Sequence, residues 1–386
     1  MFLIDGPYVS DFLKQTLEQQ KLQVVKTHYA EQELQGYKIN FLSEAEAIRL
    51  YDQNPNQQFY TNSENALDWI LQNFPNSDLT KKIKSVKDKV QFRDILAEIH
   101  PSYYYRGCKY VDLSKLDVGE IPFPVILKPS VGFFSLGVQR IENEDHWEQY
   151  LLGLNQTSAS YEDIYPRGVL DNTVFSIEAV IPGEEFAVDC FFDANGEVVI
   201  LNMMQHLFAS GDDVNDRVYI TSGALITQHL GPVLAYLQRL GDLFDLKDFQ
   251  AHIEIRIDGD EIGAIEVNPL RFGGWCSTAD LARYAWDLNL YKAVVSGFEP
   301  DWKKLIQIDP DHVYALVVLN NSTGVDGAKI TRFDYGALLD KVQEPLELRR
   351  TDFRKYPVFG FLMCRVPSNN MTELERLLHS DLSEYI

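Results

Sequence analysis

The sequence predicts a multidomain protein of mixed α/β and α+β class, because three different orders of strands and helices follow one another along the chain. Strand and helix patterns alternate over residues 1–84, which is typical of a Rossmann-like unit. The central segment, residues 85–300, contains pairs of alternating apolar strands joined by glycine-containing turns. From residue 301 to residue 386 the order is strand, helix, strand, strand, helix, a small α+β unit. A chain of 386 residues is long enough for two or three such domains.

The composition is that of an ordinary globular protein, with 45% hydrophobic and 24% charged residues. A net charge of −22 repels polyanions, so we expect neither nucleic acid nor a membrane surface as a partner. The N-terminal segment reaches Asp5 and Gly6 too early for a signal peptide, and no apolar run has membrane-spanning length. The four cysteines are scattered, which indicates neither a zinc site nor a disulfide framework. We therefore expect a cytoplasmic protein, and a homodimer is compatible with its sequence.

The elements of the N-terminal unit follow from short apolar runs and from residues that cap helices. Gly6-Pro7 lacks the GxGxxG spacing, so this unit carries no dinucleotide-binding fingerprint. The expected elements are a strand at 1–4, a helix from Ser10 or Asp11 to about Gln20, a strand at 22–26, and helices at 43–51 and 63–74.

The central segment opens with "SVKDKVQFRDILAEIH", which predicts one amphipathic helix over 85–100. Its buried face is expected to hold Val86, Val90, Ile95 and Ile99. The lysines in and just before this helix are expected to form a solvated face.

The stretch "VILKPSVGFFSLGV" that follows joins a buried strand to a loop of small residues. Lys128 ends the strand and needs a partner, because an unpaired buried ammonium is costly. The loop offers several backbone N–H groups that can close over an anion such as phosphate. The alternative is a surface hairpin with a lysine whose amine reaches solvent. The small residues of the loop are Ser130, Gly132, Ser135 and Gly137, and a returning strand is expected over 138–141.

Two hairpins are expected further along the chain. Asn195-Gly196 between alternating apolar runs marks the first. In the second, the isoleucines of "HIEIRI" share one strand face, and we place Ile265 and Val267 together on the facing strand. Both apolar sets lie on one side of the sheet if a three-residue loop spans 259–261.

This register opposes Glu254 to Glu266 and His252 to Asn268. Two facing carboxylates lie with Cβ atoms about 5 Å apart, which is unfavourable unless a cation sits between them. Magnesium, or manganese, prefers such hard oxygen ligands and completes its shell with water and phosphate. The alternative is an acidic hairpin face exposed to solvent.

The order of these motifs resembles the ATP-grasp superfamily, and within it the carboxylate–amine ligases related to the large subunit of carbamoyl-phosphate synthase. The resemblance covers about residues 85–300, with a small lobe at about 85–180 and a large lobe at about 181–300. It implies that Lys89 and Lys128 bind ATP phosphates and that the loop after Ser130 covers them. In "IEAVIPGEEF" the resemblance implies that hinge residues contact adenine and that a glutamate a few residues further on contacts the ribose. The hinge positions are Glu178, Ala179 and Ile181, and the ribose position is Glu185.

The resemblance also implies an activity. Such enzymes phosphorylate a small carboxylate with ATP, and an amine then displaces phosphate from the acyl phosphate. Glu254, Glu266 and Asn268 match the metal-binding hairpin, and Arg271 is expected to orient the acid by a bidentate contact. Two other functions remain open, a kinase of the same superfamily that acts on a hydroxyl and a nucleotide-binding regulator without catalysis.

The chain departs from the family pattern at the acceptor end. His252 stands where many members have an arginine, and we expect it to contact substrate or support the metal ligands. Leu270 is inserted before Arg271, which extends the usual Asn-Pro-Arg. Arg217 is a candidate ligand of the γ-phosphate or the acyl phosphate, with a surface-loop arginine as the equal alternative.

Overall fold

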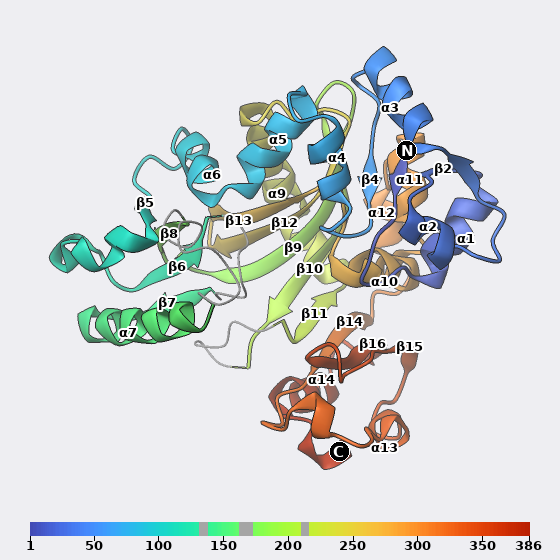
Figure 1. Ribbon diagram of the computed structural model, residues 1–386. Coiled ribbons are helices and arrows are strands. Elements are labelled where there is room, and N and C mark those ends of the chain that lie inside the picture. Colours follow the sequence, from blue (N-terminus) through green and yellow to red (C-terminus); the bar gives the residue numbers. More distant parts are fainter. Residues whose placement is uncertain (131–137, 162–172, 210–215) are drawn as a thin grey trace. The chain divides into compact units, whose positions relative to one another are not determined.

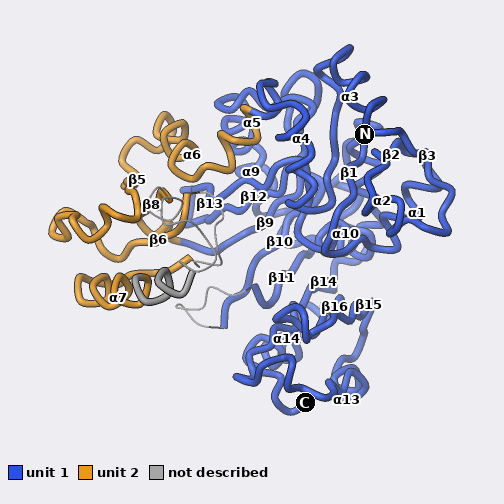
Figure 2. The backbone as a smooth tube through the Cα atoms, viewed as in Figure 1, with its two compact units in different colours: residues 1–80, 183–386 blue, residues 81–182 orange. Residues whose placement is uncertain are grey.

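The computed structural model describes residues 1–130, 138–161, 173–209 and 216–386 (Figure 1). The chain forms two compact units: unit 1 comprises Met1–Thr80 and Gly183–Ile386, and unit 2 comprises Lys81–Pro182 (Figure 2). The described part contains α/β and antiparallel α+β regions, which confirms the predicted fold class. The three-domain division at residues 84 and 300 stays a prediction. Within the described residues, no helix is both long and apolar enough to cross a membrane.

The N-terminal part of unit 1 is a parallel sheet with strand order β3-β2-β1-β4 among the described residues. The predicted Rossmann-like alternation is therefore confirmed. Ser10 begins the first helix by accepting a hydrogen bond from the Leu13 N–H, as expected from its capping role. The strands are β1 (Phe2–Leu3), β2 (Gln23–Val25), β3 (Asn40–Leu42) and β4 (Tyr60–Thr61), and the helices are α1 (Asp11–Gln19), α2 (His28–Glu33), α3 (Glu44–Gln53) and α4 (Leu67–Asn73).

Unit 2 contains an antiparallel sheet with order β5-β8-β6-β7 over its described residues. Its apolar core includes Leu127 on β6, Trp147 on α7 and Phe175 on β8. The strand that returns after the small-residue loop is present as β7 and pairs with β6, as predicted. The elements are α5 (Asp78–Lys87, which spans the unit boundary), α6 (Lys89–Leu96), β5 (Tyr105–Lys109), β6 (Val125–Pro129), β7 (Gln139–Ile141), α7 (Glu144–Tyr161) and β8 (Val174–Ala179).

The prediction of a single helix over 85–100 was wrong. The Asp88 side chain accepts hydrogen bonds from the N–H groups of Val90 and Gln91, at 3.0 and 3.1 Å, and thereby starts a second helix. The new helix turns a different face inward, since Phe92 and Leu96 are buried, whereas Ile95 and Ile99 are only partly buried.

The rest of unit 1 is built on an antiparallel sheet with order β13-β12-β9-β10-β11-β14-β16-β15 in the described part of the chain. The strands predicted for the C-terminal unit thus extend the same sheet as the central hairpins. The strands are β9 (Glu184–Phe192), β10 (Val198–Leu207), β11 (Val218–Thr221), β12 (Phe249–Asp258), β13 (Glu261–Pro269), β14 (His312–Asn320), β15 (Pro345–Arg350) and β16 (Val358–Pro367). The helices are α9 (Gly223–Leu243), α10 (Ser277–Trp286), α11 (Leu290–Ser296), α12 (Trp302–Leu305), α13 (Tyr335–Leu339) and α14 (Thr372–His379).

The β12–β13 ladder pairs Glu254 with Glu266 and His252 with Asn268, as predicted. The predicted three-residue loop was wrong, because Asp258 pairs with Glu261 and the turn holds two residues. A register shift between Glu254 and Ile255 restores the expected pairing towards the base of the hairpin. The shift falls beside Ile265, which is only partly buried and does not share the fully buried position of Val267.

Candidate active site

In unit 2, Lys128 meets the partner that its sequence position required. Its ammonium Nζ lies 3.0 Å from Glu178 Oε2, and Arg93 Nη2 lies 2.7 Å from the same oxygen. The Ser176 hydroxyl donates to Glu178 Oε1 at 2.8 Å. Lys128 is only 5% exposed, which excludes the solvent-reaching lysine that the sequence left open. Two cationic side chains therefore converge on one buried carboxylate. Lys128 belongs to β6, Glu178 to β8 and Arg93 to α6.

Electrostatics couples these groups. Burial raises the pKa of Glu178, but the charges of Lys128 and Arg93 outweigh it and lower the pKa to about 2. Burial lowers the pKa of Lys128, and the Glu178 carboxylate opposes this effect. The sequence indicated Lys128 but not Arg93. The prediction of one continuous helix did not place Arg93 on the buried face.

Lys89 and Ser130 are joined through the start of α6. The Lys89 N–H donates to the Ser130 carbonyl at 2.9 Å, and the Ser130 hydroxyl donates to Asp88 Oδ1 at 2.6 Å. Both residues were predicted to bind the nucleotide. Lys89 begins α6, Ser130 directly follows β6, and these hydrogen bonds hold the two positions together. Gly132, Ser135 and Gly137 lie outside the described residues.

The hinge positions belong to the end of β8 and the residues that follow it. The Ala179 N–H donates to the Tyr104 carbonyl, and the Tyr103 hydroxyl donates to the Ala179 carbonyl. The Glu178 side chain is engaged by Lys128 and Arg93. An adenine contact from Glu178, Ala179 or Ile181 stays a prediction.

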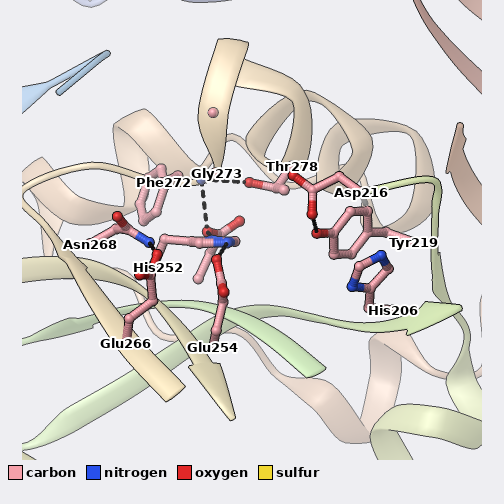
Figure 3. A network of polar contacts seen from close by, with 12 residues as sticks. His206, Asp216, Tyr219, His252, Glu254, Glu266, Asn268, Phe272, Gly273 and Thr278 are labelled. Atoms are coloured by element: carbon pink, nitrogen blue, oxygen red, sulfur yellow. Dashed lines mark hydrogen bonds and ion pairs between the residues drawn. The ribbon is translucent and has the colours of Figure 1, made fainter. Parts of the chain in front are cut away.

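In unit 1, the two opposed glutamates lie near Asn268 (Figure 3). All three side chains line a cavity that Arg271 also lines. Asn268 Nδ2 donates to Glu266 Oε1 at 2.9 Å, and Arg271 Nη2 donates to Asn268 Oδ1 at 2.8 Å. Burial and then the charge of Glu266 raise the pKa of Glu254 well above its usual range. Glu254 still presents 27% of its side chain to the cavity. A cation bound between the two carboxylates would therefore offset both the burial of the Glu254 carboxylate and its repulsion by Glu266.

The donor set fits a hard divalent cation. Two carboxylates and one amide oxygen are ligands that magnesium accepts, with the remaining positions left to water and phosphate. No cluster of three or more His, Cys, Asp or Glu side chains suited to a metal occurs among the described residues.

His252 is held by an acid that the sequence analysis missed. His252 Nδ1 lies 2.7 Å from Asp189 Oδ1, and its Nε2 lies 3.8 Å from Glu254 Oε1. Asp189 is fully buried on β9 and also accepts from the Gly273 N–H at 3.2 Å. The available signal was a single charge within the otherwise apolar run "FAVDCFF", since a buried charge needs a partner.

Glu185, the predicted ribose ligand, is paired inside unit 1. Its carboxylate lies 3.0 Å from His206 Nδ1 and 3.1 Å from Arg256 Nη2. The His206 ring stacks on Tyr219 with a centroid distance of 4.3 Å (Figure 3). A ribose contact would have to share this carboxylate with both of these side chains, and it stays a prediction.

The cavity in unit 1 has a volume of about 530 Å³, within the range of small-molecule sites. Arg271 lines it, and the inserted Leu270 before it is buried with a positive φ of 58°. Arg217 precedes β11 and is not among the lining residues, so its role stays a prediction. The polar lining consists of Asp216, Tyr219, His252, Glu254, Glu266, Asn268, Arg271, Ser277, Thr278 and Asn320.

Comparison with known proteins shows which family model and which solved structures this chain resembles. Residues 121–279 match the family model of the ATP-grasp domain. No curated protein matched the sequence. Among solved structures, the L-amino acid ligase from Bacillus licheniformis superposes with a TM-score of 0.72 at 17% identity, over 98% of this chain and 96% of that chain.

Two further structures show the same fold over nearly their whole length. The N5-carboxyaminoimidazole ribonucleotide synthetase from Thermotoga maritima gives a TM-score of 0.60 at 15% identity, over 97% of this chain and 96% of that chain. The carboxyaminoimidazole ribonucleotide synthase from Aspergillus clavatus, complexed with ATP, gives 0.63 at 12% identity, over 100% and 98%. The match of residues 121–279 to the ATP-grasp domain and the fold shared with these structures confirm the resemblance to the ATP-grasp superfamily seen in the sequence.

Proposed function

We propose that this protein is an ATP-dependent, ADP-forming ligase that activates a small carboxylate as an acyl phosphate for attack by an amine. The observation that carries the proposal is the Glu254–Glu266 pair, which faces the same cavity as Asn268 and Arg271. Oxygen ligands for a cation and a guanidinium for a carboxylate are then available to one bound substrate. Similarity to the L-amino acid ligase and to the two synthetases supports a ligase over other ATP-grasp activities.

The reaction would proceed in two steps. A carboxylate oxygen of the acid attacks the γ-phosphorus of ATP, the bond to the β,γ-bridging oxygen breaks, and ADP leaves with the bridging oxygen. The amine nitrogen then attacks the acyl carbon and the carbon–oxygen bond to phosphate breaks. Phosphate leaves with one oxygen of the acid, the nitrogen loses a proton to solvent or phosphate, and an amide remains.

Residues of unit 2 would bind the nucleotide. Lys89 and Lys128 supply positive charge for the phosphates, and Arg93 shares the Glu178 carboxylate with Lys128. Sharing leaves Lys128 less completely neutralised than a one-to-one pair would, which favours an anion at its amine. Phosphoryl transfer depends mainly on such positioning and charge neutralisation.

Residues of unit 1 would act at the acid and the metal. Glu254, Glu266 and Asn268 hold magnesium or manganese, which when bound neutralises phosphate charge. Arg271 orients the carboxylate through two parallel hydrogen bonds. His252, fixed by Asp189, contacts the substrate from the same side of the hairpin.

The proposal is tested by measuring ADP release from Mg-ATP with a panel of small acids, each with and without hydroxylamine as the amine. A ligase forms a hydroxamate in amounts equal to ADP, and only when acid, ATP and hydroxylamine are all present. ADP formation with alcohols and no hydroxamate would identify a kinase. Binding of Mg-ATP without ADP formation from any acid or alcohol would instead indicate a nucleotide-binding regulator.

A further inference from the structure

The central positions of strands β14 and β16 are apolar on both faces. On one face Val317 pairs with Leu362, and both belong to the core that α13 and α14 cover. On the other face Val318 pairs with Phe361. An antiparallel sheet face that meets water normally carries polar residues, so a second apolar face needs something to cover it. The residues around this second face indicate what covers it.

Part of the second face lines the same cavity as the glutamate pair. Leu316, Val318, Val358 and Phe361 contribute to its wall, and the Trp275 ring lies 5.3 Å from the ring of Phe361. All of these residues belong to unit 1. The cavity therefore combines a polar region, with Arg271 and the metal-binding carboxylates, and a region on β14 and β16 that is apolar except for Asn320 at the end of β14.

From this juxtaposition we infer that the acid substrate carries an apolar side chain, branched aliphatic or aromatic. The inference rests on the proposed function, because it assigns the carboxylate to Arg271. The side chain then lies against Val318, Val358 and Phe361. A polar side chain in that position would lose its water without a hydrogen-bonding partner from these three residues.

The volume agrees with a substrate of this size. About 530 Å³ is enough for a leucine- or phenylalanine-sized acid together with a phosphoryl group and a hydrated cation. A hydrophobic pocket discriminates by about 100-fold against a substrate of the same shape that carries a hydroxyl in place of a methyl group. We therefore expect at least about 10-fold selectivity for an apolar acid over a polar acid of the same shape.

The experiment uses pairs of acids of nearly equal shape, with hydroxylamine as the common amine so that any preference comes from the acid. The pairs are leucine with asparagine, and their analogues without the amino group, 4-methylpentanoate with succinamate. We expect the apolar member of a pair to have the higher kcat/KM by about 10-fold or more. Equal use of both members, or preference for the polar one, would overturn the inference while leaving the ligase activity intact.

A variant locates the preference in the cavity wall. Val318→Thr keeps the shape of the side chain and replaces one methyl group with a hydroxyl. It should reduce the ratio of kcat/KM for the apolar acid to that for the polar acid several-fold. Val295→Thr makes the same change on the exposed surface, where the side chain is 51% exposed, and should leave the ratio unchanged. An unchanged ratio in Val318→Thr would place the specificity elsewhere and refute the assignment.

Calorimetric binding of the same acids, in the presence of magnesium and ADP, separates this inference from the proposed function. Tighter binding of the apolar member, weakened by Val318→Thr, would support the inference even if no acid gives ADP. In that outcome only the proposed ligase function fails. Equal binding of both members would contradict the inference whatever the turnover.

Discussion

Replacing Glu178 with glutamine should destabilise unit 2 in a pH-dependent way. The folded protein holds the pKa of this carboxyl at about 2, against an ordinary value of 4.5. That difference, at about 1.4 kcal/mol per pH unit, corresponds to about 3 kcal/mol of stability. The side chain is only 2% exposed, so solvent screens the interaction little. Because the folded pKa is the lower one, this stability is present above pH 4.5 and is lost as the pH falls towards 2.

Urea unfolding of the two proteins at pH 7, 5 and 3 measures the effect. We expect Glu178→Gln to be less stable by about 3 kcal/mol at pH 7 and 5, with a smaller difference at pH 3. Hydrogen exchange of the β6 and β8 amides at pH 7 assigns the loss to unit 2. Glu148→Gln, at an exposed position of the same unit, is the control and should change stability by less than about 0.5 kcal/mol. A difference that is absent at pH 7, or equal at all three pH values, would refute the charge-sharing arrangement.

Three further substitutions test the residues proposed to bind the nucleotide, the metal and the acid. Mg-ATP at about 100 times its Kd should stabilise the native protein by about 2.7 kcal/mol, and Lys128→Ala should lose most of that gain in a thermal unfolding assay. Glu266→Gln should abolish magnesium-dependent ADP formation while apo stability stays equal or rises, because the repulsion on Glu254 is relieved; a clear loss of apo stability would make the pair structural. Arg271→Lys should lower kcat/KM for the acid by about tenfold, or about 1.4 kcal/mol, with unchanged ATP affinity; an equal loss in both would assign the arginine to the nucleotide.

The local features of the site could be predicted from the sequence because they depend on short-range rules. Side-chain alternation placed Glu254 opposite Glu266, although the true hairpin reaches that register through a tighter turn and a shift beside Ile265. The apolar strand before Lys128 indicated a buried lysine, and the structure decided between this and the solvent-reaching alternative. Its partner Glu178 was predicted for a different role, because pairing between β6 and β8 is not visible in a local pattern.

The features that escaped prediction depend on contacts between distant parts of the chain. The apolar periodicity predicts one continuous helix, but Asp88 interrupts it. The Asp88 side chain caps α6 and also accepts a hydrogen bond from the Ser130 hydroxyl. Asp189 orients His252 from a strand 63 residues earlier. The apolar wall around Phe361 comes from strands whose pairing with the central sheet no sequence pattern indicated.

The central claim is that the acid is activated by phosphorylation of its own carboxylate. It is tested most directly with an acid that carries ¹⁸O in both carboxylate oxygens, turned over with Mg-ATP and an amine, with the released phosphate analysed by mass spectrometry. Attack of the carboxylate on the γ-phosphorus predicts one ¹⁸O atom in each phosphate and one retained in the amide. Amide formation with unlabelled phosphate would contradict an acyl phosphate intermediate.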